Sequence, residues 1–244
     1  MEIIESLTNT KVKYWMKLKQ KKYRDLEELF MIEGYHLVNE ALKNNLIKEI
    51  IVKEGNTNKY NADMYYVTKE IMTKLSDVES VSEVIGVCYK KKEVEVGNKI
   101  IMLDALQDPG NLGCIIRSAV AFNFDTIALG DGTVDLYNEK VIRSTEGMLF
   151  NINIIKKDLK TFILELKKKN YRIYGTKQNG STPKRVITPQ NFGVIIGNEG
   201  TGISRDIIAL CDENIFIPIS DKCESLNAAV AASIIMYEMS MDHE

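Results

Sequence analysis

The sequence is poor in histidine, and this scarcity narrows the chemistry available to the protein. Only His36 and His243 occur in 244 residues, which disfavours catalytic triads and other histidine-based acid–base chemistry. The four cysteines lie far apart and form no C-x-x-C pair, which indicates reduced thiols rather than disulfides or zinc ligands. No G-x-x-x-x-G-K-S/T motif is present, which disfavours a P-loop nucleotidase. We therefore expect neither a metal site nor a P-loop.

Long apolar runs are also absent. No stretch approaches the ~18 consecutive apolar residues that a membrane span requires. The first five residues include two glutamates, and they do not form the apolar region of a signal peptide. We therefore expect a cytoplasmic protein with no membrane partner.

Positive charge is concentrated at the N-terminus. The formal net charge is −2, but residues 1–24 contain seven lysines and arginines against two glutamates. Tyr14, Trp15 and Tyr23 are interleaved with these cations, so the segment has the composition of a face that contacts phosphates and stacks on bases. The same pattern also fits a solvated helix face whose aromatic side chains turn into the core. Both interpretations remain open at the level of sequence.

Composition and periodicity predict two domains. Residues 1–90 read as a small α/β module with helices over residues 10–28 and 30–42. The charged segment 91–98 ends on turn residues and is expected to be a linker. In residues 99–244 strands alternate with helices, which predicts a parallel sheet covered on both faces. Its strands are expected over residues 99–103, 126–129, 153–156, 171–176, 192–196 and 214–217.

Three polar clusters in the C-terminal half combine glycine with amides or carboxylates. They are residues 108–113 running on to Arg117, residues 197–200, and residues 224–227. The last two stand where a β-prone run gives way to a predicted helix. Ligands bind at such strand ends in open α/β sheets, because loops and helix N-termini offer unpaired backbone donors there. We therefore interpret the three clusters as parts of one site.

Local chemistry supports this interpretation, although an ordinary strand–turn–helix remains the alternative. The glycines around Glu199 permit close approach of backbone to a ligand, and Ser204 stands where it can cap the next helix. Ser225 is the predicted N-cap of a final helix over residues 226–239. The glycine order G-x-x-G-x-G at residues 197–202 differs from the dinucleotide fingerprint, so a nicotinamide oxidoreductase is a distant third candidate.

Taken together, these segments resemble the SpoU family of RNA ribose 2'-O-methyltransferases, in the SPOUT superfamily. Residues 107–119 are similar to the first family motif, residues 196–204 to the second, and residues 217–231 to the third. Residues 30–38 are similar to the L30e-like substrate-binding module of the ribosomal-RNA members. Asp221 is a departure, because many relatives carry glycine in the loop before the third motif.

The resemblance implies an α/β fold with a parallel sheet and a deep C-terminal trefoil knot, preceded by a small L30e-like α/β domain. It also implies a homodimer that binds S-adenosyl-L-methionine between the second and third motifs. The cofactor-binding residues that it implies are Thr176, Gly197, Asn198, Gly200, Ile217 and Leu226. The residues that it implies for substrate binding and catalysis are Asn111, Arg117, Glu199, Ser225 and Asn227.

Arginine is almost never neutral in proteins, so we expect Arg117 to act as an electrostatic clamp on phosphate and alkoxide, and both the pocket of its own chain and that of the partner subunit remain open as its place of action. The function implied is methyl transfer from S-adenosylmethionine to a ribose 2'-hydroxyl of RNA, with 23S ribosomal RNA favoured by the N-terminal module. The alternatives are a transfer-RNA 2'-O-methyltransferase or antibiotic-resistance methylase of the same fold, and a non-catalytic RNA-binding or ribosome-assembly factor.

Overall fold

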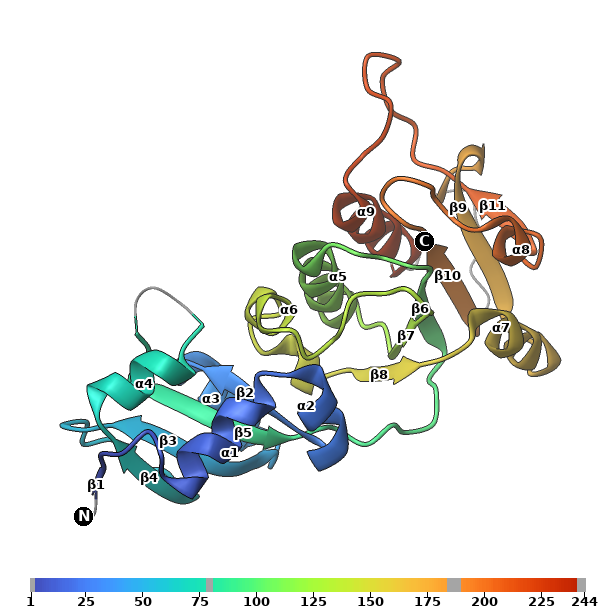
Figure 1. The fold of residues 1–244 in the computed structure, drawn as a ribbon. Helices are drawn as coiled ribbons and strands as arrows, with labels where there is room; N and C mark the ends of the chain where they lie inside the picture. Colours follow the sequence, from blue (N-terminus) through green and yellow to red (C-terminus); the bar gives the residue numbers. More distant parts are fainter. Residues whose placement is uncertain (1–2, 78–80, 184–189, 241–244) are drawn as a thin grey trace. The chain divides into compact units, whose positions relative to one another are not determined.

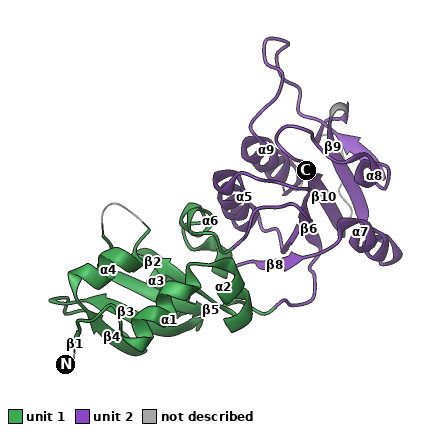
Figure 2. Cartoon of the chain, in the orientation of Figure 1, with its two compact units in different colours: residues 1–92, 137–150 green, residues 93–136, 151–244 purple. Residues whose placement is uncertain are grey.

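The chain divides into two compact units (Figures 1 and 2). This computed structural model describes residues 3–77, 81–183 and 190–240. Unit 1 consists of residues 1–92 and 137–150, and unit 2 of residues 93–136 and 151–244. The sequence predicts a different division, into two continuous domains joined by a linker at residues 91–98.

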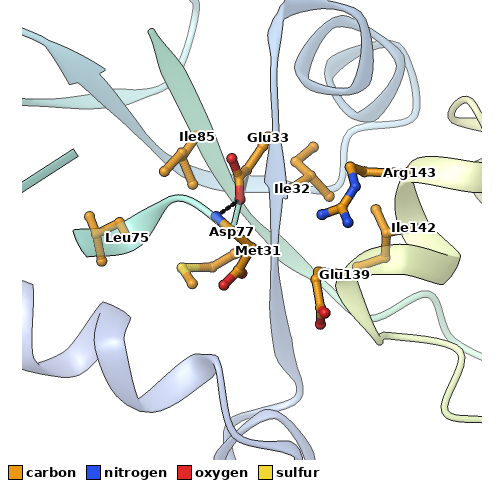
Figure 3. Close-up of a pocket in the computed structure, with 9 residues that line it drawn as sticks. All are labelled: Met31, Ile32, Glu33, Leu75, Asp77, Ile85, Glu139, Ile142 and Arg143. Atoms are coloured by element: carbon orange, nitrogen blue, oxygen red, sulfur yellow. Dashed lines mark hydrogen bonds between the residues drawn. The ribbon is translucent and has the colours of Figure 1, made fainter. Parts of the chain in front are cut away.

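Residues 137–150, which we expected in the C-terminal domain, pack within unit 1. They contain α6 (Glu139–Ser144) and the 3₁₀ helix η1 (Met148–Phe150). The Phe30 ring lies 4.5 Å from that of Tyr137 and 6.3 Å from that of Phe150, measured between centroids. Figure 3 shows Glu139, Ile142 and Arg143 of α6 lining one pocket with residues from three other segments of unit 1. Aromatic and aliphatic burial therefore attaches this segment to unit 1.

Unit 1 is built on a five-stranded mixed sheet. In sheet order its strands are β1 (Ile3–Ile4), β4 (Asp63–Val67), β3 (Ile47–Lys53), β5 (Val84–Tyr89) and β2 (Leu29–Glu33). Strand β5, between β3 and the edge strand β2, runs antiparallel to both of its neighbours, whereas β1, β4 and β3 are mutually parallel. The other helices of this unit are α1 (Thr10–Leu18), α2 (Lys21–Glu27), α3 (Tyr35–Lys43) and α4 (Lys69–Leu75).

Both helices predicted near the N-terminus are wrong in part. The first is interrupted after Leu18, because the buried Arg24 guanidinium donates hydrogen bonds to the carbonyls of Leu18 and Lys19 at 3.2 and 2.7 Å. These bonds satisfy carbonyls that a helix C-terminus leaves without partners. The second is a strand up to Glu33, and α3 begins only after Gly34, whose φ of +94° ends the strand.

The aromatic side chains near the N-terminus divide between core and surface. Trp15 is 0% exposed, and its indole N–H donates to Oε1 of the buried Glu49 at 2.7 Å. The second carboxylate oxygen accepts from Lys11 Nζ at 2.6 Å. Tyr14 and Tyr23 remain half-buried. The core interpretation therefore holds for Trp15 and in part for Tyr14, which packs against the same core, but not for Tyr23.

Unit 2 contains a six-stranded sheet in which every pair of neighbouring strands is parallel, as the sequence predicted. In sheet order its strands are β11 (Glu213–Ile215), β9 (Arg172–Ser181), β10 (Phe192–Ile196), β6 (Lys99–Leu103), β7 (Thr126–Leu129) and β8 (Asn153–Lys156). Its helices are α5 (Pro109–Ala121), α7 (Leu159–Lys168), α8 (Arg205–Ile208) and α9 (Ala228–Ser240).

Helices cover the sheet of unit 2 on both faces (Figure 1). α7 and α8 pack against the face that carries Ile100 and Met102. α5 and α9 lie side by side, and the Ser118 and Ser233 hydroxyls form a 2.7 Å hydrogen bond between them. This pairing places the last helix beside the one that carries the first polar cluster. Among the described residues no helix has the length and apolar character needed to cross a membrane.

A buried hydroxyl gives a stability prediction for unit 2. Tyr174 is 0% exposed, and its hydroxyl has no hydrogen-bond partner among the described residues. Replacing it with phenylalanine removes a desolvated polar group, so Tyr174→Phe is expected to raise the free energy of unfolding by about 1 kcal/mol. Tyr171 is the matched control, because its hydroxyl donates to the Gly97 carbonyl at 3.1 Å. Tyr171→Phe should therefore destabilise. Urea denaturation of both variants measures the difference, and a destabilised Tyr174→Phe would contradict the prediction.

Candidate active site

A chain of side-chain hydrogen bonds joins the three polar clusters within unit 2. Asn111 stands in the first turn of α5 and is 8% exposed. Its Nδ2 donates to Oε1 of Glu199 at 3.0 Å, and its Oδ1 accepts from Asn227 Nδ2 at 2.9 Å. One residue from each cluster thus takes part in the same network, at the carboxyl ends of β6 and β10.

Glu199 uses both carboxylate oxygens to hold the start of α5. Oε1 also accepts from the backbone N–H of Asp108 at 3.0 Å, and Oε2 accepts from that of Gln107 at 3.1 Å. Partial burial raises the pKa of the Glu199 carboxyl, but the hydrogen bonds from Asn111, Asp108 and Gln107 together outweigh it and hold the pKa below its ordinary value. The carboxylate is therefore ionised at neutral pH and is a weak base.

The ionised carboxylate also fixes the orientation of the two amides. A carboxylate only accepts, so Asn111 must turn its NH₂ group toward Glu199 and its oxygen toward Asn227. Asn227 then donates through its own NH₂ group, and its oxygen accepts from the backbone N–H groups of Ala229 and Val230 at 2.9 and 3.2 Å. The hydrogen bonds of the network are thus donated in one direction, from Asn227 at the cap of α9 to Asn111 and from Asn111 to Glu199.

The predicted cap of the final helix is wrong. Asn227 caps α9, and the helix begins at Ala228 rather than at residue 226. Ser225 is exposed, and its hydroxyl makes no hydrogen bond among the described residues. An N-cap oxygen reaches the second and third N–H groups of its helix, so only the residue directly before Ala228 has the required position. Ser225 is therefore free for another contact.

The turn after β10 is closed by Asn198. Its Nδ2 donates to the Ala105 carbonyl at 2.8 Å, and its Oδ1 accepts from the N–H groups of Gly200 and Thr201 at 2.9 and 3.1 Å. Gly197 is buried at the start of this turn, where an added Cβ would lie 2.3 Å from the backbone of Gly202. The turn is thus pinned to the end of β6 and requires glycine at position 197.

Ser204 occupies the N-cap position of α8 without acting as a cap. Its side chain makes no capping hydrogen bond, whereas its backbone N–H donates to Oδ2 of Asp104 at 2.7 Å. Sequence reasoning missed Asp104. It directly follows β6, so the strand-end rule that singled out the second and third clusters would have found it if applied to this strand as well.

Of the other residues expected to bind a cofactor, Thr176 lies in β9, and Ile217 and Leu226 lie in the loop between β11 and α9. The Thr176 hydroxyl donates to the Ile195 carbonyl at 2.9 Å and ties β9 to β10. Ile217 and Leu226 are half-buried, and their peptide groups make no hydrogen bond among the described residues. Asp221, the departure from the family pattern, is exposed in the same loop.

Arg117, like Ser225, is an expected site residue that stands apart from the network. It is exposed and makes neither a hydrogen bond nor an ion pair among the described residues. It lies six positions after Asn111 on α5, which corresponds to about 9 Å along the axis and roughly 240° around it. Its guanidinium is thus available to a ligand from outside the chain. Within the described residues, no three His, Cys, Asp or Glu side chains gather as metal ligands would.

The pH dependence of stability provides a test of this arrangement. Because the pKa of Glu199 is depressed from its ordinary value of 4.5, its stabilising contribution is present above that value and is lost as pH falls through the depressed pKa. Glu199→Gln turns an NH₂ group toward backbone donors and should lower the melting temperature at pH 7. The gap between the two proteins should narrow as the pH falls below 4.5 and through the depressed pKa of the wild-type carboxylate. A pH-independent gap in thermal unfolding would contradict the assignment.

Known proteins share this fold and these motifs. Residues 98–237 match the SpoU rRNA Methylase family, and residues 9–86 match the MRM3-like substrate binding domain. The chain therefore belongs to the SpoU family of RNA methyltransferases.

Individual relatives extend the similarity to nearly the whole chain. The 23S rRNA (guanosine(2553)-2'-O)-methyltransferase RlmP of Bacillus subtilis is 38% identical, over 98% of this chain and 99% of its own. A putative TrmH family tRNA/rRNA methyltransferase of Staphylococcus aureus is 30% identical over 83% of this chain and 82% of its own. The AdoMet-bound rRNA methyltransferase of Sinorhizobium meliloti superposes with a TM-score of 0.86 at 26% identity, covering 98% of this chain and 97% of its own.

Proposed function

We propose that this chain transfers the methyl group of S-adenosylmethionine to the ribose 2'-hydroxyl of a guanosine in 23S ribosomal RNA. The RNA and the nucleotide are suggested by the similarity to the Bacillus subtilis enzyme, which extends over nearly the full length of both chains. The observation that carries the proposal is the hydrogen-bonded network of Asn111, Glu199 and Asn227, which gathers the three family motifs at one edge of the sheet.

The residues at that edge fit the cofactor. S-adenosylmethionine supplies a methyl group that its positively charged sulfur already activates. We propose that its adenine ring is held by Ile217 and Leu226, whose peptide groups are free to pair with a base edge and whose half-buried side chains can cover its faces. Gly197, Asn198 and Gly200 would contact the cofactor from the closely packed turn after β10. Thr176 would contact it from the neighbouring strand β9.

The network suggests different roles for its members. Glu199 positions the start of α5 rather than abstracting a proton, because both of its carboxylate oxygens accept hydrogen bonds and its pKa is lowered. Asn111 and Asn227 each retain one N–H group beyond the network, and these groups can orient the ribose or a phosphate. Such alignment of the 2'-oxygen with the methyl carbon is the main requirement, since the methyl donor is already reactive.

Arg117 is proposed to stabilise negative charge on the 2'-oxygen and the adjacent phosphate. A free, exposed guanidinium offers a bidentate fork for such oxygens. Ser225, whose hydroxyl is also free, is proposed to bind the same nucleotide. Neither side chain touches the network within its own chain, so a partner subunit is part of the proposal.

We include in the proposal a homodimer, the deep trefoil knot, the L30e-like module and a cytoplasmic location. The dimer is supported by α9, where Val230 and Tyr237 are 48% and 47% exposed and lie two turns apart on one face. Tyr237 also packs against Phe122 at the end of α5, with ring centroids 5.7 Å apart. The knot is supported by the return of the chain from edge strand β11 to α9, which packs on α5.

Methyl transfer from labelled S-adenosylmethionine to purified RNA separates the alternatives. We expect incorporation into an unmodified 23S transcript and none into bulk transfer RNA. Incorporation only into transfer RNA would favour a transfer-RNA methyltransferase. The name of the Staphylococcus aureus relative, which mentions both tRNA and rRNA, is consistent with this alternative. Binding of RNA without calorimetric binding of S-adenosylmethionine would favour the non-catalytic assembly factor.

A further inference from the structure

Three exposed lysines on α1 and α2 lack a carboxylate partner. Lys13, Lys17 and Lys22 make no ion pair among the described residues. Neighbouring lysines of the same helices are neutralised, since Lys19 pairs with Asp77 at 2.7 Å and Lys21 pairs with Asp25. Lys13 and Lys17 are four residues apart on α1 and therefore point to the same side of the helix.

A tyrosine ring lies among these free cations. The Lys17 and Lys22 ammonium groups stand 5.6 and 5.9 Å from the centroid of the Tyr23 ring, which is half-buried. We call Lys13, Lys17, Lys22 and Tyr23 the α1–α2 lysine face. It combines positive charge with an accessible aromatic ring, the two features that proteins use to hold single-stranded nucleic acid.

Three other exposed lysines of unit 1 lie in a segment that also contains acidic residues. Lys59, Lys69 and Lys74 are exposed and make no ion pair with any residue that the structure describes, but residues 54–77 also contain four carboxylates. Residues 10–24 contain none. Residues 10–24 are therefore a segment of unit 1 in which unpaired lysines have no carboxylate beside them in sequence, which favours counterion release on binding a polyanion.

We propose that the α1–α2 lysine face binds a single-stranded part of the substrate RNA, with the three lysines on phosphates and a base stacked on Tyr23. This inference rests on the proposed function, because it takes RNA as the substrate. It adds a binding site distant in sequence from every motif of the catalytic domain. A duplex keeps its bases stacked on one another, so a stacking tyrosine favours an unpaired loop or strand.

Charge-matched variants of the full chain test the lysines. Lys13→Gln, Lys17→Gln and Lys22→Gln are combined in one protein, and Lys59→Gln, Lys69→Gln and Lys74→Gln in its control. The probe is a fluorescent transcript of the 23S segment around guanosine 2553, followed by anisotropy over a range of salt. We expect the first variant to bind on the order of tenfold to a hundredfold more weakly, with a slope against log salt reduced by about 2. Equal effects of the two variants would overturn the proposal.

The tyrosine is tested by two substitutions. Tyr23→Phe keeps a ring and should bind the probe like wild type, whereas Tyr23→Leu should bind roughly tenfold more weakly. Equal affinity of all three proteins would overturn the stacking assignment. Competition by a duplex of the same sequence as strong as that by the single strand would also overturn it.

Failure of this inference can be told apart from failure of the proposed function. The triple lysine variant should retain its affinity for S-adenosylmethionine and its kcat, while its KM for RNA rises. A wild-type protein that transfers no methyl group to any RNA would refute the proposed function, whereas the anisotropy comparison would still report on the lysine face.

Discussion

Arg117→Ala is expected to slow methyl transfer by on the order of a hundredfold or more, with little change in stability. A preorganised charge on a developing oxyanion is worth this much in other enzymes. The stability should persist because Arg117 is exposed and makes no hydrogen bond or ion pair among the described residues. Single-turnover kinetics at saturating RNA and S-adenosylmethionine measure the loss, and thermal unfolding measures the stability.

Two variants serve as controls for this prediction. Arg205→Ala removes another exposed arginine of unit 2 that forms no ion pair within the described part of the chain, and it should retain near wild-type turnover. Arg117→Lys keeps the charge but loses the bidentate fork, so it should fall between alanine and wild type. Near-full turnover by Arg117→Lys would refute the bidentate clamp, and near-full turnover by Arg117→Ala would remove Arg117 from the site.

The same residue tests whether the active site is shared between subunits. A chain with Arg117→Ala, co-expressed with one carrying Asn227→Ala, which disables the network of its own chain, forms mixed dimers. If Arg117 acts on the pocket of the partner, one site of each mixed dimer is intact, and about a quarter of the wild-type activity returns. If Arg117 acts within its own chain, both sites are defective and no activity returns.

Gly197→Ala is expected to destabilise the protein by about 3 kcal/mol or more and to weaken S-adenosylmethionine binding roughly a hundredfold. An added Cβ would lie 2.3 Å from both Gly202 C and Ile203 N. These are backbone atoms, so the overlap can be relieved only by moving the turn that Asn198 closes. Urea denaturation and calorimetric titration with the cofactor measure the two effects.

Gly200→Ala is the matched control in the same turn. Its added Cβ would meet only Asn198 Oδ1, at 3.6 Å, which is an ordinary contact. It should therefore change stability by less than about 1 kcal/mol. Comparable losses in the two variants would show that the turn is sensitive to any side chain, and would contradict a specific requirement at Gly197.

The sequence was most informative where strands are buried on both faces. The bounds of β6, β7 and β10 coincide with prediction, because a central parallel strand appears as a short apolar run between turns, and the bounds of the edge strand β8 coincide as well. The segment after Phe30 was mispredicted because apolar residues at positions 30, 32, 37 and 38 suit both periodicities. Local sequence does not decide between a helix and a strand here, whereas the pairing of β2 with β5 does.

Long-range hydrogen bonds account for most of the remaining differences. The sequence shows a carboxylate at Glu199 but not that its oxygens are taken by the start of α5, a segment about ninety residues earlier. Likewise, Ser225 and Asn227 are both acceptable N-caps by residue type. Asn227 caps α9 while its amide also donates to Asn111, and this second bond is invisible in a single sequence.

Mass spectrometric mapping of ribose methylation in 23S ribosomal RNA tests the central claim most directly. Ribosomal RNA from cells lacking the gene would be compared with RNA from the same cells supplied with wild-type protein or with Arg117→Ala. We predict one guanosine 2'-O-methyl group that is absent without the gene, restored by the wild type and not restored by Arg117→Ala. An unchanged 2'-O-methylation pattern in 23S ribosomal RNA without the gene would contradict the account.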